Sequence, residues 1–138
     1  MIQRLSHIGI AVADLEKSLA LYQQIFQPAA IHREVVPEQR VEVASFVVGG
    51  VRIELVAPTS PDSPIARFLE QRGDGIHHLA FESDDVAAEL DRLAQQGIQL
   101  INATPTRGAH DMLIAFLHPK STGGVLLELC QHHQTAHK

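Results

Sequence analysis

The 138-residue chain has no tryptophan, one tyrosine and one cysteine, and only 4% of its residues are aromatic. The single cysteine, Cys130, cannot form a disulfide within the chain, so we expect a reducing, cytoplasmic setting. The chain has no run of Lys or Arg, and its 16 acidic residues outnumber its 11 basic ones. This composition argues against nucleic-acid or membrane partners. We expect no signal peptide and no transmembrane segment, because no apolar run approaches the roughly 18 residues that span a bilayer.

The chain contains an internal repeat. The segment HIGIAVADLEKSLALY, which begins at His7, aligns with HLAFESDDVAAELDRL, which begins at His78, at an offset of 78 − 7 = 71. Each segment starts with alternating apolar residues, which predict a strand. Apolar residues at helical spacing follow Asp14 in the first copy and Asp84 or Asp85 in the second. We therefore expect a strand and then a helix in each copy, with these aspartates as N-caps.

The ends of the two copies also match. Residues 49–56 read GGVRIELV and residues 123–130 read GGVLLELC, at an offset of 128 − 54 = 74. Each Gly-Gly pair lies between two β-rich runs, which is typical of an antiparallel hairpin. The change in offset predicts that the second hairpin is longer. With one more extended run in each copy, near 29–36 and 98–102, each copy reads strand, helix, strand, strand, strand.

The predicted fold class is α+β, with two tandem βαβββ modules that form a curved mixed sheet around a central metal site. The modules cover about residues 4–57 and 76–131, and we interpret the 138 residues as a single domain. Residues 58–75 form a linker with a short helix capped by Asp62 or Ser63. Residues 132–138 are interpreted as a polar tail whose three histidines are solvated.

Four residues occupy matched positions in the repeat, with His7 and His78 on the first strands and Glu54 and Glu128 on the last strands. Burying one such glutamate alone on a sheet costs on the order of several kcal/mol. A divalent cation removes the repulsion between the two carboxylates and takes neutral imidazole nitrogens as further ligands. The repeat therefore predicts one divalent metal ion (Co, Mn, Ni, Zn or Fe) bound by these four residues, with open positions for water or substrate.

The other histidines of the two modules are not predicted as ligands. Strand alternation sends His77 to the face opposite His78, and the repeat selects His78. His32, His110 and His118 have no counterpart in the other copy, so each is interpreted as a surface or loop residue.

Four segments resemble the vicinal oxygen chelate superfamily and, within it, the methylmalonyl-CoA epimerases: HIGIAVADLEKSLALY, VPEQ, IELVAPTSPDSPIARFLEQRGDGIHHLAFE and FLHPKSTGGVLLEL. The likeness covers nearly the whole chain. It implies the same four metal ligands, an acyl-CoA substrate with a methyl-branched malonyl group, and a homodimer. It also implies that Glu128 is the catalytic base that takes the proton from C2.

The second catalytic group departs from the family pattern. Epimerisation requires an acid on the face of C2 opposite the base. Some epimerases have a second glutamate at the position of Val43, whereas this chain has a glutamate one residue earlier. We take that residue, Glu42, as the candidate, although regular alternation aims it away from the site unless a bulge re-aims it. The segment GAHDMLIAF, which replaces a glycine-rich segment of the family, offers His110 and Asp111 as alternatives.

Two other functions are compatible with the same fold. A glyoxalase I-like isomerase or lyase would use the four ligands on a glutathione adduct or a different acid. A non-catalytic binding module would trap a small molecule without a metal, but the intact ligand set argues against it. Two histidines and one carboxylate could also bind iron for oxygen activation, but the fourth ligand, Glu54, argues against that chemistry.

Overall fold

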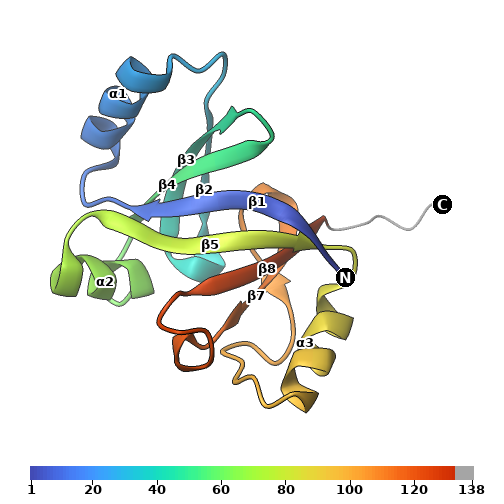
Figure 1. Ribbon diagram of the computed structural model, residues 1–138. Coiled ribbons are helices and arrows are strands. Elements are labelled where there is room, and N and C mark those ends of the chain that lie inside the picture. Colours follow the sequence, from blue (N-terminus) through green and yellow to red (C-terminus); the bar gives the residue numbers. More distant parts are fainter. Residues whose placement is uncertain (133–138) are drawn as a thin grey trace. The chain divides into compact units, whose positions relative to one another are not determined.

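The computed structural model describes residues 1–132 (Figure 1). Its elements follow the order predicted for two βαβββ modules, which confirms the α+β class. The first module and linker contain β1 (Ile2–Ala11), α1 (Leu15–Phe26), β2 (His32–Val36), β3 (Val41–Val48), β4 (Val51–Pro58) and α2 (Pro64–Arg72). The second contains β5 (Gly75–Ser83), α3 (Val86–Gln95), β6 (Thr106–Arg107), β7 (Met112–Leu117) and β8 (Leu127–His132). The short 3-10 turns are η1 (Pro37–Gln39), η2 (Ala109–Asp111) and η3 (Pro119–Ser121).

The chain divides into two compact units. The N-terminal unit is His7–His78, and the C-terminal unit is Met1–Ser6 with the chain from Leu79 onward. Strands β1 and β5 each contribute one part to each unit. The strand order is β2-β3-β4-β1-β5 in the N-terminal unit and β1-β5-β8-β7-β6 in the C-terminal unit. The predicted linker 58–75, with helix α2, belongs to the N-terminal unit, and the interpretation as a single domain stays a prediction.

Equivalent strands of the two modules have equivalent registers. In the first module β1 and β4 are parallel, with Gly9 opposite Glu54. In the second module β5 and β8 are parallel, with Ala80 opposite Glu128. These pairs reproduce both offsets of the repeat, 80 − 9 = 71 and 128 − 54 = 74. The hydrogen-bonding register therefore confirms the repeat residue by residue.

The two glycine pairs close hairpins of different length, as predicted. Gly49 and Gly50 alone join β3 to β4, and Gly49 has the positive φ of 62° that such a turn requires. The β7–β8 connection is longer and includes η3 as well as Gly123 and Gly124, which have φ values of 71° and 93°. The insertion is confined to this connection and leaves the strand register intact.

The second strand of the second module is not where the sequence predicted it. The run near 98–102 forms only an isolated bridge, between Leu100 and Leu117. The strand equivalent to β2 is β6, which pairs with β7. The repeat offset carries the end of β2 onto it, since 35 + 71 = 106. A two-residue strand is too short to produce a visible alternation of apolar and polar residues.

The last strand runs further than predicted. Strand β8 continues through Gln131 to His132, which is opposite Met112 of β7. His132 therefore belongs to a strand and not to the polar tail. The remainder of the predicted tail, 133–138, with His133 and His137, lies outside the described residues.

Each helix begins at a predicted cap. The carboxylate of Asp14 accepts a hydrogen bond of 3.1 Å from the backbone N–H three residues further on, and Asp85 does the same at 3.1 Å. Of the two candidates for α2, Ser63 is the cap, because its hydroxyl accepts from a backbone N–H at 3.2 Å. No helix among residues 1–132 is long and apolar enough to cross a membrane.

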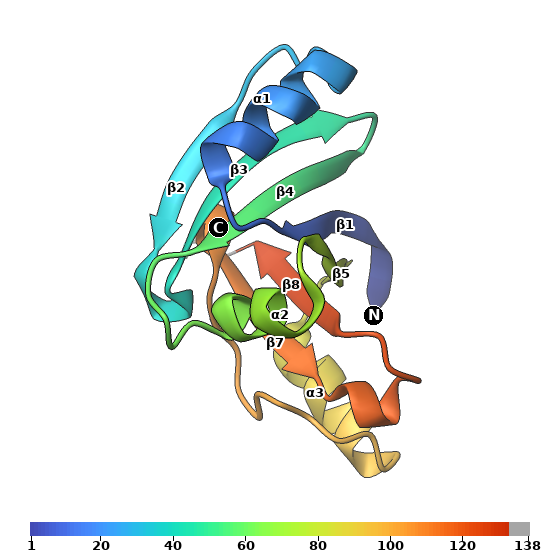
Figure 2. The ribbon, with the colours of Figure 1, turned by 90° about the vertical axis from the view of Figure 1, so that its left-hand side faces the viewer.

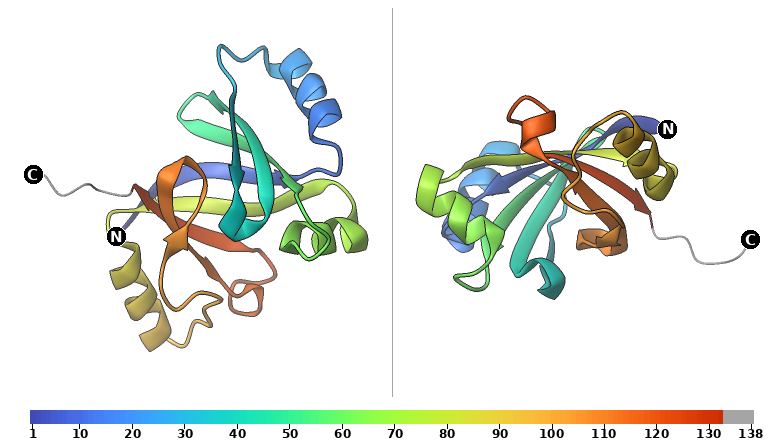
Figure 3. Two further views of the ribbon diagram at one scale, coloured as in Figure 1. Left: turned by 180° about the vertical axis from the view of Figure 1, so that it is seen from behind. Right: turned by 90° about the horizontal axis from the view of Figure 1, so that it is seen from below.

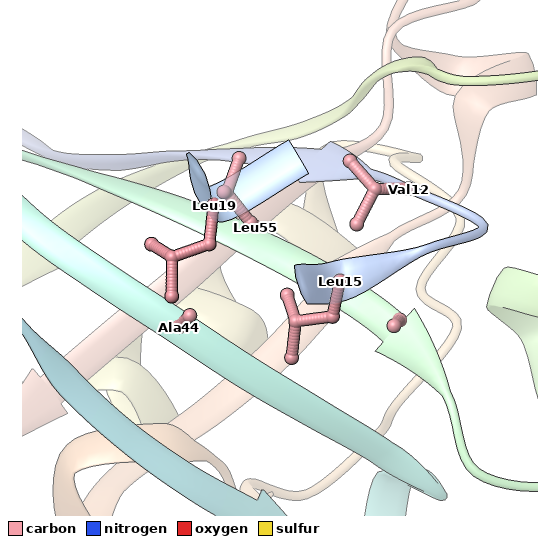
Figure 4. Packing of buried hydrophobic residues seen from close by; sticks show 6 residues of the cluster. Val12, Leu15, Leu19, Ala44 and Leu55 are labelled. Atoms are coloured by element: carbon pink, nitrogen blue, oxygen red, sulfur yellow. The ribbon is translucent and has the colours of Figure 1, made fainter. Parts of the chain in front are cut away.

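Helix α1 covers one face of the sheet in the N-terminal unit (Figure 2). Its Leu15 and Leu19 pack against Ala44 of β3 and Leu55 of β4 (Figure 4). In the C-terminal unit, α3 packs on β7 and β8 in a separate buried cluster (Figure 3). The face of the N-terminal sheet that α1 covers is called the helix face below, and the opposite face is called the site face.

Candidate metal centre

The strand registers bring polar residues into one row on the site face. Opposing residues of neighbouring strands point to the same side of a sheet. One such row contains His32 of β2, Ser45 of β3, Glu54 of β4 and Gly9 of β1. The next row includes Leu55, which packs under α1, so alternation places the row of Glu54 on the site face.

Three of the four predicted ligands meet on this face. His7 lies on β1 two residues before Gly9, and its Nε2 is 3.6 Å from Oε1 of Glu54. The ring of His78, from β5, stands edge-on to the ring of His7, with centroids 5.5 Å apart. Donor atoms of His7, Glu54 and His78 all lie within 4.8 Å of one another. The three residues are only 3% to 7% exposed.

This donor set fits a divalent cation. Such ions bind imidazole nitrogen and carboxylate oxygen at about 2.0 to 2.2 Å, so donors on one ion stand roughly 3 to 4 Å apart. The 3.6 Å between His7 and Glu54 lies in this range, and no two donors of the group are more than 4.8 Å apart. The cluster can therefore hold a metal ion through two nitrogens and one carboxylate.

Gly9 provides the space for His78. A Cβ atom at position 9 would lie 2.1 Å from Cε1 of His78, and 2.5 and 2.6 Å from its two ring nitrogens. The imidazole thus rests directly on the backbone of β1, where only glycine leaves room. Sequence reasoning missed this role. The available signal was a glycine inside an apolar strand, which often marks a close approach by another group.

Arg52 is a second residue that the sequence analysis missed. It lies two residues before Glu54 on β4, and its Nε donates to Oε2 of Glu54 at 2.8 Å. Its Nη2 lies 3.1 Å from Nδ1 of His7. A guanidinium only donates, so Nδ1 accepts and a neutral His7 carries its proton on Nε2. A cation on Nε2 would require the ring proton on Nδ1, and Arg52 would then have to leave that atom.

His77 lies beside the cluster and is not a member of it. Its ring packs edge-on against Phe68 of α2, with centroids 5.0 Å apart. Burial lowers the pKa of His77 to about 4, so the ring is neutral near pH 7. Its Nδ1 is 3.0 Å from Nδ1 of His78. The structure thus places His78 among the grouped donors, and His77 supports that ring from the side.

Glu128, the fourth predicted ligand, lies on β8 in the C-terminal unit. It is 3% exposed, and its register neighbours are Ala80 of β5 and Phe116 of β7. Its assignment to the metal rests on the repeat and on the family resemblance.

Glu42, the predicted second catalytic residue, lies on the helix face. Strand β3 pairs residue by residue with β4 from Val41 to Val48, which places Glu42 opposite Ala57 on that face. Its carboxylate accepts from Arg33 at 3.1 Å, and Arg33 also binds Glu16 of α1. Hydrogen bonds to Glu16 and Glu42 raise the pKa of Arg33. The structure therefore ties Glu42 to α1 and does not bring it to the grouped ligands.

The alternative acids and the remaining histidine lie in the C-terminal unit. His110 and Asp111 both have left-handed backbone conformations, with φ values of 59° and 56°. Asp111 forms an ion pair of 3.3 Å with Arg107. Nδ1 of His118 accepts from the N–H of Lys120 at 3.1 Å and caps η3, which is a local structural role.

Comparison with known proteins identifies the family. The profile of the Glyoxalase/Bleomycin resistance protein/Dioxygenase superfamily matches residues 6–116. The chain therefore belongs to this superfamily. An uncharacterised protein of Bacillus subtilis, YqjC, is 44% identical over 128 residues, which cover 93% of this chain and 91% of the relative. The ethylmalonyl-CoA/methylmalonyl-CoA epimerase of Cereibacter sphaeroides is 39% identical over 133 residues, covering 95% and 99%.

Solved structures agree with these relatives. The methylmalonyl-CoA epimerase of Mycobacterium tuberculosis has a TM-score of 0.91 and 38% identity, and the match covers 96% of this chain and 90% of that one. A variant of the Streptomyces coelicolor methylmalonyl-CoA epimerase in complex with 2-nitronate-propionyl-CoA has a TM-score of 0.90 and 34% identity, covering 97% and 100%. These matches confirm the predicted fold and the resemblance on which the sequence interpretation relied.

Proposed function

We propose that the protein is a metal-dependent epimerase that interconverts the two C2 configurations of a methyl-branched malonyl-CoA. One observation carries the proposal: His7, Glu54 and His78 form a buried donor set on the site face. The Cereibacter sphaeroides relative and the Mycobacterium tuberculosis and Streptomyces coelicolor structures described above, at 34% to 39% identity, are epimerases of such thioesters by name.

The metal ligands in this proposal are His7, Glu54, His78 and Glu128. Glu128 is included because the repeat makes it the counterpart of Glu54. A divalent cation, one of Co, Mn, Ni, Zn or Fe, would supply positive charge beside the thioester and carboxylate oxygens of the substrate and so stabilise the charge that develops as the C2 proton leaves.

The side chains have separate tasks. The C2 proton is acidic because a thioester and a carboxylate flank it, and Glu128 takes this proton as the general base. His7 and His78 act as neutral nitrogen ligands. Gly9 fixes the place of the His78 ring, and Arg52 balances the charge of Glu54.

Deuterium exchange combined with metal analysis tests the proposal. In deuterated water, metal-loaded wild type should exchange the C2 hydrogen of a single methylmalonyl-CoA epimer and invert its configuration. Glu128→Gln should do neither. His7→Ala, His78→Ala and Glu128→Ala should each lower the bound metal well below one ion per chain, and Glu54→Ala should have a milder effect.

His118→Ala is the matched control, since this histidine caps η3 and should leave metal content and turnover at the wild-type level. A fully metal-loaded wild type that neither exchanges nor inverts the thioester would contradict the epimerase proposal. An activity on glutathione adducts would then favour the glyoxalase I-like isomerase or lyase, and tight ligand binding without turnover would favour a binding module.

We also propose that the protein is a homodimer, as the family resemblance implies. Light scattering at micromolar concentration should give the mass of two chains. The mass of one chain at every concentration would rule out the dimer. The cytoplasmic location stays a prediction from the sequence.

A further inference from the structure

Inversion at C2 requires a second proton donor, and the expected position cannot provide one. Val43 stands at the position where some epimerases have a glutamate, and a valine side chain has no proton to transfer. Val43 is 3% exposed, in the middle of β3. It lies in the row next to that of Glu54 on the site face, opposite Val56 of β4. The residue directly opposite Val43 on its other side is Glu34 of β2.

We propose that Glu34, positioned by His32, is the second acid of the epimerisation, an inference that rests on the function proposed above. Opposing residues of antiparallel strands point to the same face, with Cβ atoms about 4.5 to 5.5 Å apart. Glu34 therefore carries its carboxylate on the site face, immediately beside Val43. The carboxyl group that the family places on β3 is replaced by one on the neighbouring strand.

His32 connects this carboxylate to the solvent. It lies two residues before Glu34, so both side chains are on the same face of β2, and its Nε2 is 2.8 Å from Oε1 of Glu34. The side chain of His32 is 50% exposed and that of Glu34 is 28% exposed. An imidazole that is hydrogen-bonded to a carboxylate and open to water can pass a proton from one to the other. His32 thus orients the carboxylate and returns a proton to it after each turnover.

The pair lies in line with the metal ligands. His32 shares its row with Ser45 and Glu54, and Ser45 is the residue between them. Neighbouring strands are about 4.8 Å apart, so β2 lies roughly 10 Å from β4 along the sheet. Glu54 of the ligand set and the carboxylate of Glu34 therefore lie on the same face of the sheet, separated by the width of β3. The arrangement fits an acid that meets the substrate from the side away from the ligands.

The proposed step conserves atoms and charge. The base breaks the C2–H bond on one face and becomes protonated, while the electron pair passes into the enolate. Protonated Glu34 then forms the new C2–H bond on the opposite face and ends as a carboxylate. Both groups exchange protons with water before the next turnover, and the reverse reaction exchanges their roles.

Separate measurement of exchange and inversion tests Glu34. Glu34→Gln should still exchange the C2 hydrogen of the epimer that the base deprotonates, with retention, while its rate of inversion falls by at least about 100-fold, the usual contribution of a general acid. Glu42→Gln is the matched control. It changes the same residue type on the adjacent strand but on the helix face, and it should behave like wild type.

Two further variants sharpen the test. Val43→Glu in the Glu34→Gln background restores a carboxylate at the family position and should recover inversion by at least about 10-fold, within the range of acid catalysis. His32→Ala should slow inversion more than exchange and change its pH profile. Thermal unfolding checks that each variant is folded.

Three outcomes would overturn the assignment. Inversion at the wild-type rate in Glu34→Gln would exclude Glu34 and leave the epimerase proposal intact. Loss of exchange together with inversion in the folded variant would place Glu34 on the base side. Failure of Val43→Glu to recover any inversion would show that the loss is not due to the missing carboxyl group. An inactive wild type would instead refute the proposed function itself.

Discussion

The two modules share one strand register and differ in what surrounds the glutamate on it. In the first module Glu54 is opposite Gly9, on whose backbone a histidine ring rests. In the second module Glu128 is opposite Ala80, where a methyl group stands in place of that space. The repeat thus determines where a ligand lies along its strand. The residue opposite the glutamate differs between the copies, and this difference determines whether another side chain can pack beside the glutamate.

A second difference concerns the strand before the hairpin. Strand β2 has five residues and carries the pair His32 and Glu34, whereas β6 has two. The repeat offset carries this pair onto Ala103 and Pro105, since 32 + 71 = 103 and 34 + 71 = 105, and neither of these can transfer a proton. An epimerase has to treat the two faces of C2 differently. The first module, which has the five-residue strand β2, is therefore the one that can supply the second proton donor.

The largest expected effect tests whether the two modules have equivalent cores. Leu55 and Leu129 are repeat equivalents (55 + 74 = 129) and are 0% and 1% exposed. Changing either to alanine leaves a cavity and should lower the free energy of unfolding by about 2 to 5 kcal/mol. Urea denaturation measures both losses. The exposed Val47→Ala should cost less than about 1 kcal/mol, and a loss that small at Leu55 or Leu129 would refute the equivalence of the cores.

A smaller effect is expected where the modules differ. Gly9→Ala places a methyl group against the ring of His78 and should weaken metal binding by about 10- to 100-fold, as loss of ligand orientation does elsewhere. The reciprocal change, Ala80→Gly, should leave metal affinity unchanged and cost about 1 kcal/mol of stability. Competition with a chelator gives both affinities. Equal weakening by the two substitutions would show that Gly9 has no special role at the metal centre.

The features that could be predicted from the sequence are those that the repeat displays twice. The two aligned segments at an offset of 71 predicted the capped helices, and GGVRIELV against GGVLLELC at an offset of 74 predicted the hairpins and the positions of Glu54 and Glu128. The same argument chose His78 over His77, and the structure places His78 with His7 and Glu54. In these cases a weak pattern occurred twice, and each copy supported the interpretation of the other. A single alternating run would not have been enough to predict the same features.

The features that occur once could not be found in this way. His32 was set aside because it has no counterpart, although it is the partner of Glu34 on the site face. Gly9 acts through a contact with a residue 69 positions away (78 − 9), which no local pattern reveals. The strand near 98–102 was predicted as the counterpart of the extended run near 29–36, but it forms only the isolated bridge between Leu100 and Leu117. Long-range packing decides such cases, and periodicity carries no information about it.

The smallest expected effect concerns the helix caps, where the two modules are most alike. Asp14 and Asp85 are repeat equivalents (85 − 14 = 71), and each accepts a 3.1 Å hydrogen bond from the N–H three residues further on. Replacing either with alanine leaves that N–H without its side-chain acceptor and should destabilise the protein by about 1 kcal/mol. Asparagine keeps an accepting oxygen, so Asp14→Asn and Asp85→Asn are the controls and should cost little. Chemical denaturation resolves differences of this size. Equal losses would show that the two caps contribute the same stability, so the modules are equivalent in their helices as well as in strand register. A loss at only one cap would show that the modules are equivalent in their strands alone.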